Sequence, residues 1–243
     1  LIYMEKSKKI KIYLGLIYSI IILVFFWFFF NNFSISEITS YEFIKGNKDI
    51  ILKYKESNIY YMTIIFFFIV VLLNLLLFPI TLPTLVIGFI FGKWLGTAIL
   101  VLGNTFGSAL LYILANTFFS EFIQKKFSTK FSKHVELFNR NELLYFMFFR
   151  FIGGGGIPFS IQNILPVIYN MSIKNYIIAT FIGMIPTTFV SAALASGVEN
   201  FIDQNIEFNF FLALSSPEIY FPIFGFFVLL LLSFIVKKFF FTK

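Results

Sequence analysis

The chain has 243 residues, of which 59% are hydrophobic and only 13% are charged. A soluble globular domain usually carries about 25% charged residues, so this composition excludes an ordinary soluble protein and indicates an integral membrane protein. The formal net charge is +7, but the lysines cluster beside hydrophobic segments, where they orient membrane spans, so nucleic acid is not an expected partner. The absence of cysteine excludes disulfides, thiolate metal sites and cysteine nucleophiles.

Six apolar segments follow one another along the chain, and most are long enough to cross a bilayer, which takes about 20 apolar residues. They are 12–30, 59–92, 94–120, 143–169, 176–197 and 220–236. The first resembles a signal peptide, but no small-residue cleavage site follows its apolar core. We therefore expect a retained anchor helix.

Two of these segments contain residues that a continuous helix does not accommodate. Segment 59–92 contains Pro79 and Pro83, and segment 143–169 contains a glycine run followed by Pro158. Glycine and proline both weaken a helix interior, and irregular backbone at membrane depth is tolerated only where it is buried in protein or lines a cavity. We predict that both segments are re-entrant helical hairpins, in an all-α, polytopic integral membrane protein.

The charges between the apolar segments predict the topology. Lysines precede the first span and close the chain, loop 121–142 carries five basic residues, and 198–219 carries acidic residues only. Because basic loops stay in the cytoplasm, both termini and loop 121–142 should be cytoplasmic, in the inner (plasma) membrane. With two re-entrant hairpins every one of these loops lies on its favoured side, whereas full crossings would place loop 121–142 outside.

The same arrangement contains a repeat, because a broken hairpin followed by a full span occurs twice with opposite orientation, as in many transporters. We expect an N-terminal anchor helix and extramembrane segment over 1–58. A membrane core should follow over 59–200, then an external loop and a C-terminal transmembrane helix over 201–243. Lysines and acidic residues balance in segment 31–60, so its position stays open.

Glycines recur at four-residue spacing in the first half of the core. They are Gly88, Gly92 and Gly96, followed by Gly103 and Gly107. This spacing lines glycines along one helix face, where a neighbouring backbone can approach closely. We predict a structural packing role for them and an interhelical hydrogen bond from the adjacent Asn104.

Arg150 stands in an otherwise uncharged apolar run, where a guanidinium costs about 2.5–3.5 kcal/mol on membrane-insertion scales. Segment 143–197 holds no acidic residue, so the counter-charge must come from elsewhere in the chain or from a ligand. In a structural interpretation, the side chain reaches out from a helix end or bonds to backbone carbonyls. In a functional interpretation, it contacts an anionic group in a polar cavity. The other expected members of such a substrate-binding site are Gly153, Gly154, Gly155, Gly156, Pro158 and Asn163.

The sequence contains no metal-ligand spacing, phosphate-binding loop, catalytic triad or paired carboxylates. We therefore expect neither a metal, nor a cofactor, nor enzymatic activity.

The order of these motifs resembles the DedA superfamily. The glycine pattern comes first, then Arg150 with Pro158-Phe159 and Asn163, and then Gly183 with Pro186. The closer similarity, over about residues 75–200, is to the branch of SNARE-associated Golgi proteins that share the VTT domain. The resemblance implies two re-entrant elements in inverted orientation and a role in moving phospholipids or polyprenyl-phosphate carriers between leaflets. It also implies structural roles for Gly183 and Pro186.

The chain departs from the family pattern in ways that bear on mechanism. The glycine run lengthens the gap between Arg150 and Pro158, and Asn116 stands where a basic residue is expected. Acidic residues of proton-coupled relatives have no clear match inside the membrane. These departures place proton coupling in more doubt than lipid handling.

The leading functional hypothesis is translocation or scrambling of a phospholipid or polyprenyl-phosphate lipid, with membrane lipids bearing anionic head groups as partners. Transport of an ion or small anion and a non-transporting membrane scaffold both stay open, as does a homo-oligomer.

Overall fold

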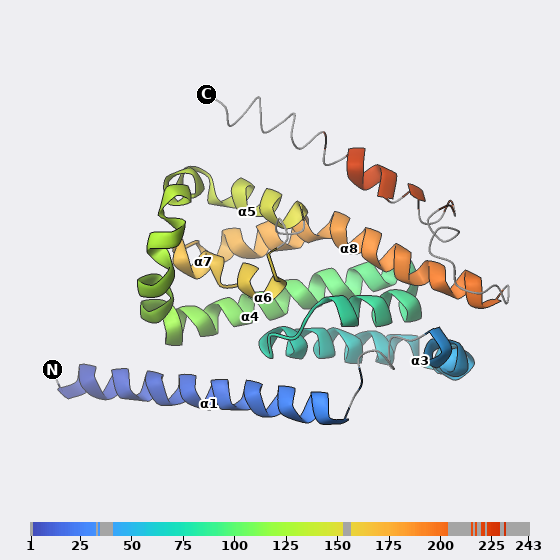
Figure 1. The fold of residues 1–243 in the computed structure, drawn as a ribbon, viewed down its shortest axis with the longest axis horizontal. Coiled ribbons are helices and arrows are strands. Elements are labelled where there is room, and N and C mark those ends of the chain that lie inside the picture. The colour runs from blue at the N-terminus through green and yellow to red at the C-terminus, as the bar shows by residue number, and fades with distance from the viewer. Residues whose placement is uncertain are drawn as a thin grey trace.

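The computed structural model describes residues 2–32, 34, 41–152, 157–203, 215, 217, 220, 221, 223–228 and 231. This part of the chain is helical and contains no strand, which confirms the predicted all-α class. The helices are α1 (Ile2–Asn32), α3 (Tyr41–Leu75), α4 (Thr81–Arg140), α5 (Glu142–Phe151), α6 (Phe159–Gln162), α7 (Leu165–Ile168) and α8 (Ile173–Asp203). In Figure 1 most of them run along the long axis of one elongated bundle.

Four stretches of helix are long and apolar enough to cross a membrane. They are Ile12–Asn32, Lys53–Leu75, Thr81–Glu121 and Ile173–Gly197. Large apolar side chains such as Trp27, Phe68 and Phe106 are exposed on their outer faces, and lipid is the solvent that suits such a surface. Of the predicted last span, 220–236, the structure describes 220, 221, 223–228 and 231, and the rest lies outside the described residues.

Segment 59–92 doubles back on itself at its prolines. Helix α3 ends at Leu75, the turn 76–80 contains Pro79, and α4 begins at Thr81. The rings of Phe66 and Phe91 pack with their centroids 5.2 Å apart, so the first turns of α4 run back beside α3 (Figure 1). We call residues 59–91 the first hairpin; that it enters and leaves the bilayer on one side stays a prediction.

A second reversal occurs at Gly92, within the stretch labelled α4. Gly92 has φ +73°, a value that residues with a side chain rarely adopt. Beyond it, Gly96 lies against the carbonyl oxygen of Ile87 and the backbone of Gly88. Glycine on both arms allows this close approach.

The other glycines of the spaced pattern also lie at helix contacts. Gly88 faces Ala192 and Ala195 of α8, while Gly103 and Gly107 face Val70 and Asn74 of α3. Asn104 accepts a hydrogen bond from Asn74 at 2.7 Å, so the expected interhelical bond is formed, between α4 and α3.

The sequence predicted a loop at 121–142, and this prediction was wrong. Helix α4 continues to Arg140, and only Asn141 separates it from α5. The side chain of Asn141 accepts a hydrogen bond from the amide of Leu144 at 3.3 Å, as a helix N-cap does. Lysine and glutamate are good helix formers, so the charge of this segment marks it as polar without ending the helix.

Residues 142–172 form a second doubled-back segment, which we call the second hairpin. Glu142, at the start of α5, accepts hydrogen bonds from the Ser172 amide at 3.2 Å and from the Asn175 side chain at 2.6 Å. The chain therefore returns at residue 172 to the place that it left at residue 142. Its breaks separate α5, α6 and α7, and the glycine run 153–156 lies outside the described residues.

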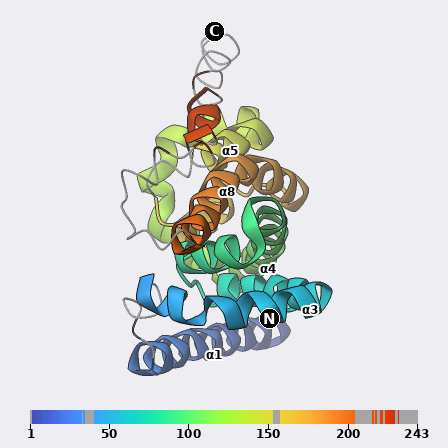
Figure 2. The same cartoon turned by 90° about the vertical axis from the view of Figure 1, so that its right-hand side faces the viewer.

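The two hairpins meet at their tips. The hydroxyl of Ser160 in α6 donates to the carbonyl oxygen of Leu77 in the turn of the first hairpin, at 3.1 Å. In Figure 1 the first hairpin opens toward the right of the bundle and the second toward the left, with α8 running past both. The breaks of both hairpins thus lie together inside the bundle, while α1 lies along its outer side (Figure 2).

Candidate functional site

Arg150 is among the largest fully buried side chains in the described structure, with 1% of its surface exposed. It lies in the last turn of α5, which packs directly on α8. Gly183 permits this packing, because a Cβ at that position would lie 2.5 Å from the Met147 carbonyl oxygen and 2.7 Å from the Arg150 Cβ. Gly183, which was predicted to have a structural role, therefore helps to position Arg150.

Neutral side-chain oxygens surround the guanidinium. Its terminal nitrogens donate to Gln162 Oε1 at 2.9 Å, to the Tyr176 hydroxyl at 3.1 Å and to Asn163 Oδ1. The Tyr176 hydroxyl in turn donates to Asn163 Oδ1 at 3.2 Å. Gln162 and Asn163 belong to the tip of the second hairpin and Tyr176 to α8, so Arg150 ties the tip, α5 and α8 together.

Aromatic rings complete the surroundings of Arg150. Its central carbon lies 4.8 Å from the centroid of Phe159, 5.0 Å from that of Phe146 and 5.9 Å from that of Tyr176. Such cation–π contacts favour a desolvated cation. These rings and hydrogen-bond acceptors stabilise the positive charge, but none of them carries a negative charge to neutralise it.

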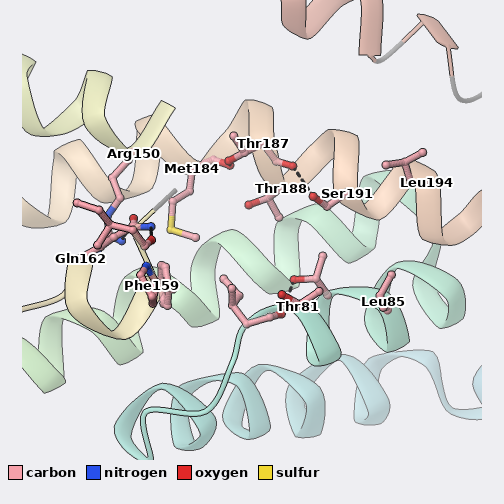
Figure 3. A pocket seen from close by; sticks show the side chains of 14 residues that line it. Thr81, Leu85, Arg150, Phe159, Gln162, Met184, Thr187, Thr188, Ser191 and Leu194 are labelled. Carbon is pink, nitrogen blue, oxygen red and sulfur yellow. Dashed lines mark hydrogen bonds between the residues drawn. The ribbon is translucent and has the colours of Figure 1, made fainter. Parts of the chain in front are cut away.

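A cleft of about 550 Å³ begins at Arg150 and lies between the first turns of α4, the tip of the second hairpin and α8. Figure 3 shows Arg150, Phe159 and Gln162 at one end, and Thr81, Thr188 and Ser191 in the middle. The side chains of Leu85 and Leu194 lie at the far end (Figure 3). The cation therefore lies at one end of the cleft, among apolar side chains such as Phe159 and Met184, the hydroxyls lie in the middle, and leucines lie at the far end.

Several hydroxyls of the cleft donate their protons back to their own helix. Thr84 donates to the Ile80 carbonyl at 2.8 Å, and Ser191 donates to the Thr187 carbonyl at 2.9 Å. Thr187 donates to the Met184 carbonyl at 3.2 Å. A hydroxyl oxygen keeps acceptor capacity after donating, so these side chains can still accept hydrogen bonds from a ligand or from water.

The predicted site residues are only partly brought together. Arg150 and Pro158 line the cleft, whereas Asn163 lies behind Arg150, 1% exposed. Gly153, Gly154, Gly155 and Gly156 lie outside the described residues. Pro186 is inside α8 and directly precedes the cleft residue Thr187.

Other members of the site were not found from the sequence. Tyr176 and Phe146 surround the guanidinium, and Thr81 and Thr84 form the wall opposite α8. The only signal for them was indirect, because a buried arginine without an acidic neighbour requires polar or aromatic groups from elsewhere.

The arrangement agrees with a comparison against protein families. The family model of the VTT domain matches residues 78–197. The chain is a VTT-domain protein. This is the domain of the DedA and SNARE-associated Golgi protein family. The matched range begins in the turn of the first hairpin and ends in α8, so the VTT domain includes every residue that lines the cleft.

No curated protein and no solved structure matches the chain. The VTT domain together with the four long apolar helices makes it a multi-pass membrane protein.

Proposed function

We propose that this VTT-domain protein translocates or scrambles a phospholipid or polyprenyl-phosphate lipid between the two leaflets of the inner (plasma) membrane. The observation that carries the proposal is the lining of the cleft, with a cation at one end that contacts no acidic side chain of the described residues, and leucines at the other. A phosphate-bearing lipid has a matching anionic end and apolar end.

The size and surroundings of the cleft support a lipid. Its volume of about 550 Å³ falls in the range of about 300–1,000 Å³ that is usual for small-molecule sites. Exposed apolar side chains such as Phe181 and Ile185 cover α8 outside it. A polar head group could therefore use the cleft while the acyl or prenyl chain stays in hydrocarbon, which avoids the cost of moving a charge through the bilayer centre.

Arg150 would act on the phosphate through an exchange of partners. Gln162 both accepts from the guanidinium and lines the cleft. If a phosphate oxygen replaces Gln162 Oε1, the guanidinium donates to an anion instead of a neutral amide oxygen, and the attraction between opposite charges is added to the hydrogen bond. Asn163 and Tyr176 would hold the guanidinium in place meanwhile.

We further propose that both termini are cytoplasmic and that the protein moves lipid without covalent catalysis. The orientation has a direct test, because the chain contains no cysteine and a single one can be introduced. In intact cells, Lys125→Cys should resist a membrane-impermeant maleimide and react only after the cells are opened. Lys53→Cys, exposed near the start of the α3 span, should react in intact cells. The opposite labelling pattern would overturn this orientation.

The function itself is tested with purified protein in liposomes containing head-group-labelled lipids. Wild type should move lipid between leaflets faster than empty vesicles. Ser191→Leu, which fills the middle of the cleft with an apolar side chain, should slow transport at least tenfold. Thr63→Leu is a matched control, because Thr63 lies on α3, outside the cleft, and its hydroxyl donates to the Ile59 carbonyl of its own helix; its rate should equal that of wild type.

The other outcomes identify the alternatives. Lipid movement no faster than in empty vesicles contradicts the proposal. If a soluble anion passes while lipid does not, the protein is an ion or small-anion transporter that uses the same cation. If neither moves although the protein remains folded, the buried polar cluster serves a membrane scaffold.

A further inference from the structure

The N-terminal part of α3, residues 41–57, differs in direction from the rest of the bundle. The backbone of Asn58 is non-helical, with φ −138° and ψ 31°, and the apolar span of α3 continues beyond it. Figure 1 shows residues 41–57 nearly end-on, whereas Figure 2 shows them along their length. This segment therefore crosses the direction of the spanning helices, as a helix lying in the plane of the membrane would.

The sequence of this segment is amphipathic. Phe43, Ile50 and Tyr54 recur at spacings of seven and four residues, which places them on one helical face. In the sequence pattern Ile44 and Ile51 fall beside them, and most of the charged residues, together with Leu52, fall on the other side. No neighbouring helix covers the described part of the apolar face, because Ile50 is 71% exposed and Tyr54 is 54% exposed.

The depth of the Asn58 bend in the bilayer indicates what covers the apolar face of residues 41–57. Tyr60 and Tyr61 follow the bend directly and are 86% and 61% exposed. Tyrosine is enriched at the membrane–water interface, so the bend at Asn58 lies at that interface. A helix that begins at this level and runs across the direction of the spanning helices has its apolar face beside the lipid.

We propose that residues 41–57 form an interfacial helix whose apolar face is buried in the head-group region of the bilayer that α3 spans. Such helices bind by apolar burial together with attraction to anionic lipids. Four lysines stand against three acidic residues in this segment, so apolar burial dominates and anionic lipid is not required. The helix fixes the height of the first hairpin in the membrane, and with it one wall of the cleft.

Single cysteines that carry an environment-sensitive fluorophore test the proposal on the full chain in phosphatidylcholine vesicles. Ile50→Cys and Tyr54→Cys report on the apolar face, and Lys53→Cys and Glu56→Cys on the polar face of the same helix. Labels at positions 50 and 54 should emit at a shorter wavelength than labels at 53 and 56, and spin-labelled acyl chains should quench them. Labels at 53 and 56 should instead be quenched by aqueous iodide, and anionic lipid should change neither result.

Two outcomes would overturn the proposal. Equal quenching by iodide at positions 50 and 53 means that the helix projects into water. Protection of positions 50 and 54 from both quenchers means that protein, such as a second copy of the chain, covers the face. Because the assay reads depth alone, its result is independent of whether the protein transports lipid.

Discussion

Gly183→Ala is expected to be among the most damaging single-methyl additions in this protein, lowering the free energy of unfolding by about 3 kcal/mol. Overpacking a filled interior usually costs about 1–3 kcal/mol. The new Cβ would lie 2.5 Å from the Met147 carbonyl oxygen and 2.7 Å from the Arg150 Cβ. Neither atom can turn away, because one belongs to the backbone of α5 and the other is attached to it. Helices α5 and α8 must therefore separate, which also disturbs the hydrogen bonds of Arg150.

Thermal melting of the purified protein in detergent measures this loss. For a chain of this size 1 kcal/mol corresponds to about 2–4 °C, so the expected fall is about 6–12 °C. Gly46→Ala is the matched control, because no atom lies within 4 Å of a Cβ built there. It removes a helical glycine and should be neutral or stabilise by about 0.5–1 kcal/mol. Equal melting temperatures for the two variants would show that α5 and α8 are not packed as described.

Arg150→Ala should produce the second large effect, a loss of both stability and lipid transport. Truncating a large buried side chain costs about 2–5 kcal/mol. In addition, the oxygens of Gln162, Asn163 and Tyr176 each lose a charged donor, and an unsatisfied buried polar group costs about 1–3 kcal/mol. The tip of the second hairpin would then lose these hydrogen bonds to α5 and α8.

Arg150→Met and Tyr176→Phe separate transport from stability. Methionine keeps much of the apolar stem but removes the positive charge, so the folded fraction of Arg150→Met should move lipid at least tenfold more slowly than wild type. Tyr176→Phe keeps the charge and removes one neutral hydroxyl, so it should lower the melting temperature while its folded fraction retains most of the transport. Transport is therefore expressed per folded protein. If Arg150→Met transports at the wild-type rate once corrected in this way, Arg150 has only a structural role.

The segment that was predicted wrongly shows what local sequence patterns report. Five basic residues in 121–142 indicated a polar segment outside the hydrocarbon and were interpreted as a loop, yet the helix runs to Arg140. Charge patterning reports the surroundings of a segment, whereas helix termination depends on backbone capping, which here occurs at Asn141. The hairpin turns were easier to predict, because proline and glycine act on the backbone where they stand.

Local patterns in the chain are enough to establish an all-α, multi-pass membrane protein, chain reversals near Pro79 and after Arg150, and the need of Arg150 for polar surroundings. Hydropathy, helix breakers and a charge within an apolar segment can each be recognised from a short stretch of sequence. The groups that surround the guanidinium and the position of the cleft depend instead on how distant helices pack together. Tyr176 is 26 residues from Arg150, and the walls of the cleft come from α4, the second hairpin and α8. Those contacts exist because glycines such as Gly183 let distant helices approach, and the spacing of residues within one helix does not specify which helix will be its neighbour.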